Sequence, residues 1–170
     1  HIATGNTNRT KLNSNAASGS SSAWNNTTPS SSVVTLGSQS EVNTSGATQI
    51  MYCFHSVDGY SKVGSYTGNS STDGTFVYLG FRPAYVMSKG SSDGGQWNIQ
   101  NNKSSPYNVV DKTIFANDSP GEYTDPAAAC LIDFTSNGFK WRNNDDANNY
   151  TGRTYIYIAF AETPFKYSNA

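Results

Sequence analysis

The chain has little charge, little cysteine and no long apolar run. Charged residues make up 14 % of it and the formal net charge is −1, against a typical charged share of ~25 %. This balance provides no basic face of the kind that nucleic-acid binding requires. No apolar run approaches the ~20 residues of a membrane-spanning helix. The sequence therefore predicts neither a nucleic-acid partner nor membrane insertion.

The two cysteines carry no disulfide-framework pattern. Cys53 and Cys130 each lie in an apolar, strand-like run. A disulfide would form if the two strands were neighbours, but the interpretation we favour is two small buried apolar side chains.

Ligands for a metal ion are also scarce. The two histidines, His1 and His55, are too few for a zinc site, and no C-x-x-C motif is present. Asp145 and Asp146, in the run 143–146, offer oxygen ligands of the type that calcium binds. Ordinary turn chemistry, in which Asn and Asp bond their own backbone, is the favoured alternative. We expect no cofactor.

Catalytic patterns are missing as well. His55 and Ser56 are adjacent, and neighbouring residues on a strand point to opposite faces. There is no G-x-S-x-G nucleophile elbow, and most acidic residues lie in turn-like stretches without an obvious catalytic pair. We therefore predict no catalytic residues and a protein that is not an enzyme.

What the chain does contain is aromatic and polar uncharged side chains. Aromatic residues make up 13 %, and large rings let a polar sequence bury enough surface to fold. Disorder is associated with few aromatics and high net charge, so we expect a folded body. Abundant Ser, Thr and Asn with low charge suits an extracellular β-protein or a structural fibre.

Short apolar runs separated by turn residues predict an all-β fold. No run has apolar residues at helical spacing over three turns, whereas about seven to nine short strands follow one another with turn signals between them. Asp93-Gly94-Gly95 and Asn137-Gly138 are hairpin signals. The expected fold is a jelly-roll-like antiparallel β-sandwich over residues 37–170, with an extended N-terminal arm over residues 1–36. The expected strands are 33–36, 48–57, 75–79, 84–87, 97–99, 130–134, 139–141 and 154–160, and residues 107–110 are expected to be a short strand or a loop.

One stretch of sequence has a second, similar copy. Residues 46–54 (GATQIMYCF) correspond, 106 residues further along, to residues 152–160 (GRTYIYIAF), with Gly, Thr, Ile and Phe at equivalent places. A second copy of an element suggests a tandem repeat, and the spacing leaves roughly half a unit in front of one whole unit. We therefore expect a chain that completes its fold with a neighbour, by donating a strand to an open sheet edge. The candidates for the donated strand are Ser31, Ser32, Val33, Val34, Thr35 and Leu36.

Several motifs also carry a family resemblance. They are residues 52–69 (YCFHSVDGYSKVGSYTGN), 73–78 (DGTFVY), 80–84 (GFRPA), 106–108 (PYN) and 159–167 (AFAETPFKY). Together they resemble an uncharacterised repeat domain of virion structural and tail-fibre-like proteins of aquatic bacteriophages. The resemblance covers roughly residues 33–170 and implies an extracellular or virion-surface structural module. It brings no catalytic residues with it.

The leading hypothesis is therefore a non-enzymatic protomer of an extracellular or virion-associated fibre, assembled head to tail with copies of itself by strand addition. The alternative is a lectin-like adhesion module for cell-surface glycans. Its candidate sugar-binding residues are Trp97, Tyr107, Trp141, Arg142 and Tyr150, near polar side chains. The competing interpretation of these rings is that they belong to a core or an interface.

Overall fold

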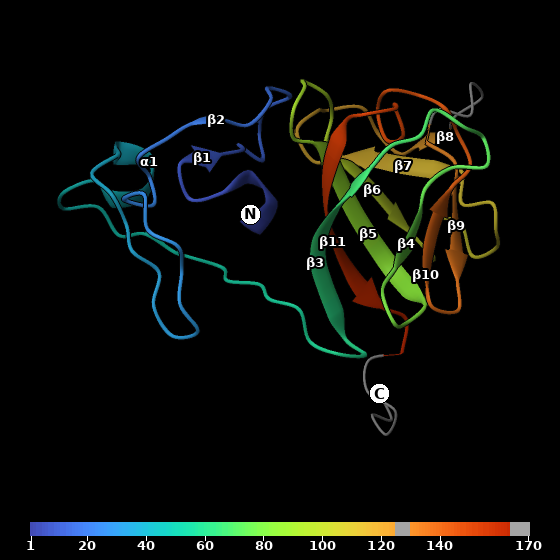
Figure 1. The fold of residues 1–170 in the computed structure, drawn as a ribbon, viewed down its shortest axis with the longest axis horizontal. Coiled ribbons are helices and arrows are strands. Elements are labelled where there is room, and N and C mark those ends of the chain that lie inside the picture. Colours follow the sequence, from blue (N-terminus) through green and yellow to red (C-terminus); the bar gives the residue numbers. More distant parts are fainter. Residues whose placement is uncertain (125–129, 164–170) are drawn as a thin grey trace.

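The computed structural model describes residues 1–124 and 130–163, and in these ranges it is essentially all-β, with antiparallel sheets. A small N-terminal part precedes a larger body of two sheets (Figure 1). In the N-terminal part, the elements are η1 (Ile2–Thr4), β1 (Asn8–Arg9), β2 (Gly19–Ser20) and α1 (Ser40–Asn43). In the body, they are β3 (Ser61–Thr67), β4 (Phe76–Tyr78), β5 (Pro83–Gly90), β6 (Asn98–Asn101), β7 (Lys112–Phe115), β8 (Tyr123–Thr124), β9 (Ile132–Thr135), β10 (Gly138–Trp141) and β11 (Thr154–Ala161).

The body is built from a large and a small antiparallel sheet. The strand order is β3-β11-β5-β6-β7-β8 in the large sheet and β4-β10-β9 in the small one. β11 lies between β3 and β5 and pairs with both over most of its length. The β9–β10 hairpin confirms the Asn137-Gly138 signal, and the β5–β6 pair confirms the one at Asp93-Gly94-Gly95.

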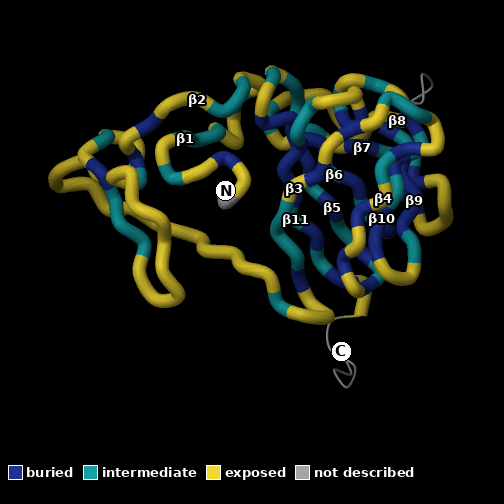
Figure 2. The backbone as a smooth tube through the Cα atoms, viewed as in Figure 1, coloured by how far each residue is buried: buried dark blue, intermediate teal, exposed yellow. Residues whose placement is uncertain are grey.

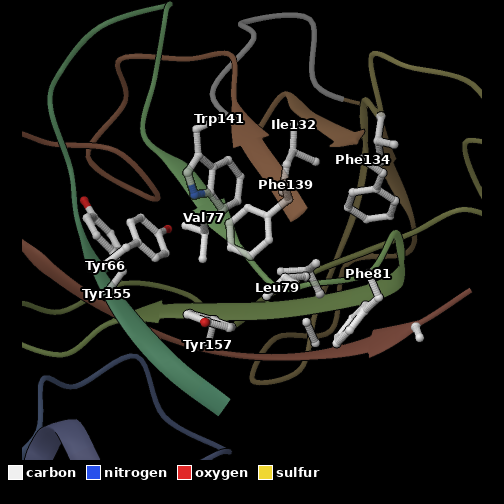
Figure 3. Close-up of a cluster of buried hydrophobic side chains, with 14 residues drawn as sticks. Tyr66, Val77, Leu79, Phe81, Ile132, Phe134, Phe139, Trp141, Tyr155 and Tyr157 are labelled. Atoms are coloured by element: carbon white, nitrogen blue, oxygen red, sulfur yellow. The ribbon is translucent and has the colours of Figure 1, made fainter. Parts of the chain in front are cut away.

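One hydrophobic core lies where the two sheets face each other. It is made by alternate side chains of the strands, which Figure 3 shows pointing inward from both sheets. The rings of Tyr66 and Tyr155 are stacked 5.1 Å apart, and Phe139 meets Tyr157 edge-on at 5.5 Å. Such ring pairs stabilise by about 0.5–1.5 kcal/mol beyond their buried area. The cluster consists of Tyr66, Val77, Leu79, Phe81, Val86, Val110, Ile132, Phe134, Phe139, Trp141, Tyr155, Tyr157, Ala159 and Ala161.

The buried amide of Asn149 connects the β3–β4 loop with the segment that precedes β11. Asn149 is fully buried. Its Oδ1 accepts hydrogen bonds from Asn69 N (3.1 Å) and Thr75 Oγ1 (3.2 Å). Its Nδ2 lies within hydrogen-bond distance of Asn69 Oδ1 and Ser71 O (both 2.9 Å) and of Asn143 O (2.6 Å). One side chain therefore connects the β3–β4 loop to the chain that leads into β11.

Two of the expected strands are wrong, and a third stretch takes its alternative form. Residues 33–36 and 48–57 form no strand, and residues 107–110 form a loop that ends in an isolated bridge between Val110 and Ile132. The first stretch contributes two valines and a leucine but lies among serines, and no sheet edge accepts it. The second has the strand pattern but no neighbouring backbone to pair with. β3 was missed, because glycine and serine interrupt its apolar pattern. Gly64 is needed there, since a Cβ at that position would lie 2.7 Å from the Tyr157 hydroxyl.

The extended N-terminal arm expected over residues 1–36 is not confirmed. The N-terminal part lies to one side of the body in Figure 1. Backbone and side-chain bonds fasten residues 11–18 to the β5–β6 end of the large sheet. Among the residues described, no helix has the length and apolar character needed to span a membrane.

Candidate assembly site

Residues 48–54 run between the N-terminal part and the body as an exposed, extended stretch, which Figure 2 shows as a continuous yellow run. We call Thr48–Phe54 the bridge segment. Three of its large apolar side chains face water: Ile50 is 77 % exposed, Tyr52 80 % and Phe54 62 %. Apolar side chains gathered on a surface in this way often mark a contact site.

The backbone of the bridge segment has no hydrogen-bond partner among the described residues. The chain is held on both sides of it. Ala47 N donates to Thr44 O at 3.2 Å, and Val57 and Ser61 exchange two bonds at 2.9 Å. Seven consecutive residues thus run in extended form, and their N–H and C=O groups are unpaired with respect to residues 1–124 and 130–163. Such a row of unpaired groups is the template on which another strand can pair.

An apolar groove adjoins the end of the bridge segment. The ring of Phe54 meets Phe160 of β11 edge-on, with ring centres 6.0 Å apart. With Tyr85, Met87 and Ile158, these rings line an open groove of about 420 Å³. The groove lies on the face of the large sheet that points away from the core.

That outer face carries an apolar row across five strands. Register places Val63, Ile158, Met87, Ile99 and Ile114 directly opposite one another in turn. All five side chains are partly exposed or exposed. A sheet face in water usually carries polar residues, so this row extends the apolar surface that begins at the bridge segment.

The N-terminal part covers another region of the same face and fixes one end of the bridge segment. The buried Lys89 donates to the carbonyls of Asn15 (3.2 Å) and Gly95, and its ammonium lies 5.8 Å from the centre of the Trp97 ring. Trp97 Nε1 donates to Lys11 O at 2.9 Å. Burial lowers the pKa of the Lys89 ammonium. Lys89 had no sequence signal, because a single lysine in a strand usually lies in water.

The residues predicted for self-assembly, 31–36, form no strand in the structure. Ser31 and Ser32 lie in a tight turn, in which Ser30 N donates to Val33 O at 2.9 Å and Ser30 Oγ accepts from Val33 N at 3.0 Å. Val34, Thr35 and Leu36 continue without strand pairing. Strand donation by residues 31–36 stays a prediction. The bridge segment has the geometry that was expected of residues 31–36. The sequence repeat was its signal, although it was interpreted as a buried strand.

The predicted sugar-binding residues are not brought together into one open platform. Trp141 is fully buried and Trp97 is 8 % exposed, so neither presents a ring face for stacking, which corrects that part of the prediction. Arg142 is held by Asp133 at 2.6 Å. Tyr150 has Arg153 over its ring, with 4.6 Å between the guanidinium carbon and the ring centre. Tyr107 is 82 % exposed. Glycan binding through Tyr107, Arg142 and Tyr150 stays a prediction.

The candidate calcium ligands have local partners. Asp145 Oδ1 accepts from Ala147 N at 2.8 Å, as in an ordinary Asx turn. Asp146 Oδ2 lies 3.3 Å from Arg153. In residues 1–124 and 130–163, no group of three or more His, Cys, Asp or Glu side chains is placed to hold a metal. No disulfide joins Cys53 and Cys130. Cys130 is buried as expected, but Cys53 lies exposed in the bridge segment.

The fold and the open segment define an all-β domain with a surface suited to pairing with another chain. A family model described as a domain of unknown function, DUF7483, matches residues 1–164. The chain belongs to this family. Searches of curated proteins and of solved structures found no match.

Proposed function

We propose that this domain is a non-enzymatic structural module that assembles with copies of itself through the bridge segment, as part of an extracellular or virion-associated fibre. Two facing sheets with a shared core support the proposal that the body is a jelly-roll-like sandwich. The DUF7483 match does not assign an activity. The fibre context rests on the low charge, the polar composition and the resemblance to tail-fibre-like repeat domains.

A single observation carries the proposal. Seven residues with strand-forming side chains run in extended form, with no backbone partner in the part of the chain that the structure describes. Pairing them with another strand gives affinity through backbone hydrogen bonds and specificity through alternate side chains. It also removes Ile50, Tyr52 and Phe54 from water, which is favourable in proportion to the apolar area buried.

Proline substitution tests the proposal, because proline removes a backbone donor and is excluded from the interior of a sheet. The test variant is Ile50→Pro combined with Tyr52→Pro. The matched control is Ser45→Pro, in the exposed turn closed by Ala47 N and Thr44 O. Gly46 follows with φ 75°, so position 45 is one where a turn accepts proline.

Sedimentation velocity over a range of protein concentrations provides the measurement, with electron micrographs of the concentrated protein. The wild-type chain and Ser45→Pro are expected to form larger species as concentration rises, and the double variant is expected to stay monomeric. A wild-type chain that stays monomeric throughout, or a double variant that assembles equally well, would show the proposal to be wrong.

A further inference from the structure

Sheet edges are the usual acceptors for an added strand, and in this chain side chains block one of them. The free edge of β3 is occupied at three places. Ser56 Oγ accepts from Val63 N at 3.1 Å, Thr75 Oγ1 donates to Thr67 O at 2.8 Å, and Ser61 pairs with Val57. Capping an edge in this way prevents pairing with another chain.

The other described edges are blocked or short. At β9, the Asn108 amide takes the place of a neighbouring strand: Oδ1 accepts from Phe134 N at 2.9 Å and Nδ2 donates to Phe134 O at 3.0 Å. The edge strands β4 and β8 have three and two residues. Within the described ranges, the bridge segment is therefore the longest unpaired strand-like backbone, and it is also the most suitable partner for a bridge segment of another copy.

The bridge segment is complementary to itself in the antiparallel direction. With Tyr52 opposite Tyr52, Ile50 lies opposite Phe54, and all three occupy one face, because side chains two apart share a face of a strand. Aromatic and β-branched residues directly opposite each other are favourable cross-strand pairs. No residue from Ala47 to His55 is Asp, Glu, Lys or Arg, so no charge repulsion opposes the approach of two copies.

Strand β11, which the bridge segment resembles in sequence, also favours antiparallel pairing. Residues 46–54 resemble residues 152–160, with Gly, Thr, Ile and Phe at equivalent places, and residues 152–160 include most of β11. β11 pairs antiparallel on both of its sides, and its Ile156, Ile158 and Phe160 share the outer face. Phe54, the counterpart of Phe160, already contacts that ring. The aromatic face of a paired bridge would thus continue into the apolar groove.

We infer that two copies of this chain pair through their bridge segments as antiparallel strands about a two-fold axis at Tyr52. This inference rests on the proposed function and replaces the head-to-tail contact expected from the sequence with a symmetric one. The same patch on both copies forms the contact, which closes as a dimer. A fibre built on it needs a second kind of contact.

Disulfide cross-linking tests the register. Directly opposite residues of antiparallel strands have Cα atoms about 4.5–5.5 Å apart, within the range of about 4.4–6.8 Å that a disulfide spans. In a Cys53→Ala background, Tyr52→Cys is expected to shift from monomer to dimer mass on a non-reducing gel. Ser45→Cys in the same background, an exposed thiol outside the bridge segment, is expected to stay monomeric.

A mixing experiment keeps the test independent of Tyr52. Ile50→Cys and Phe54→Cys, each in the Cys53→Ala background, are expected to cross-link when mixed and not when alone. Dimers from each single variant alone would indicate parallel pairing and overturn the inference. Oxidation that leaves Tyr52→Cys monomeric, although the same sample sediments as a larger species, would overturn it and leave the proposed function standing.

The bridge segment could pair with strand β3 in place of a second bridge segment, and a cross-link distinguishes the two. The hairpin register of Val57 opposite Ser61, continued along the chain, brings Cys53 opposite Ser65. A disulfide between native Cys53 and Ser65→Cys would therefore reveal pairing with β3, within one chain or between two, and would overturn the symmetric contact. A chain that sediments as a monomer under all conditions would refute the inference together with the proposed function.

Discussion

Removing the Asn149 amide is expected to destabilise the body strongly. Asn149→Ala deletes the side chain whose Oδ1 accepts from Asn69 and Thr75 and whose Nδ2 faces the oxygens of Asn69, Ser71 and Asn143. A buried polar group left without a partner costs about 1–3 kcal/mol. Some of the freed groups will find water, so we expect a loss of about 3 kcal/mol in the free energy of unfolding, the equivalent of two or three such groups.

Thermal unfolding followed by circular dichroism measures this loss. About 1 kcal/mol lowers Tm by about 2–4 °C in a protein of this size, so Asn149→Ala is expected to melt about 6–12 °C below the wild-type chain. Asn149→Asp keeps the acceptor but places a carboxylate against three oxygens, and it should be at least as destabilised. Asn144→Ala, in the same loop but exposed, is the control and should melt with the wild type. A Tm of Asn149→Ala within a degree or two of the wild-type value would refute the proposed role of the amide.

Three further predictions concern Lys89, Gly64 and the buried tyrosines of the core. Lys89→Ala removes the donor to Asn15 and Gly95 and should make the N-terminal part more sensitive to limited proteolysis, while the melting of the body changes little; equal proteolysis rates would contradict this. Gly64→Ala places a Cβ 2.7 Å from the Tyr157 hydroxyl and should cost about 1–3 kcal/mol, measured by urea unfolding; unchanged stability would show that Tyr157 moves aside freely. Burial raises the pKa of Tyr66, and also that of Tyr157, so their neutral forms stabilise the fold fully below pH ~10, and this contribution is lost as pH rises through the raised values. Phenolate absorbance during an alkaline titration should therefore show these tyrosines ionising only as the body unfolds, and early ionisation would contradict their burial.

Six strands of the body, namely β4, β5, β6, β9, β10 and β11, were predictable because their signals are local, whereas β7 and β8 were missed. Alternating apolar residues and a hairpin dipeptide were enough to place the β9–β10 hairpin around Asn137-Gly138. β3 was not predictable in this way. Its Gly64 is required by the Tyr157 hydroxyl of β11, and a sequence does not reveal a close approach between strands so far apart along the chain.

The bridge segment shows what a strand pattern does and does not indicate. Residues 48–57 were expected to form a strand, and residues 48–54 resemble residues 154–160 of β11, but the structure has no strand there. Whether a strand pairs depends on a neighbouring edge, and that edge is a property of the tertiary structure. The strand pattern therefore did not reveal that this backbone has no pairing partner among the described residues.

The prediction that the tryptophan rings form a sugar-binding surface was wrong for a related reason. Trp97 and Trp141 lie among polar residues in the sequence, which suggested an exposed platform. In the structure, Trp141 fills the core and Trp97 is closed over by the N-terminal part. The polar neighbours instead form long-range bonds, such as those of Asn149 to Asn69 and Thr75. Composition does not distinguish these two uses of the same residues.

Backbone hydrogen exchange of the bridge segment at low and high protein concentration tests the central claim most directly. Peptides that cover residues 48–54 should exchange without protection in the dilute monomer, because their N–H groups have no partner in residues 1–124 and 130–163. On concentration, the same peptides should become protected, while those of the body strands keep the protection they already have. Protection that is present in the monomer, or exchange that stays fast in a concentrated sample, would contradict an assembly built on this segment.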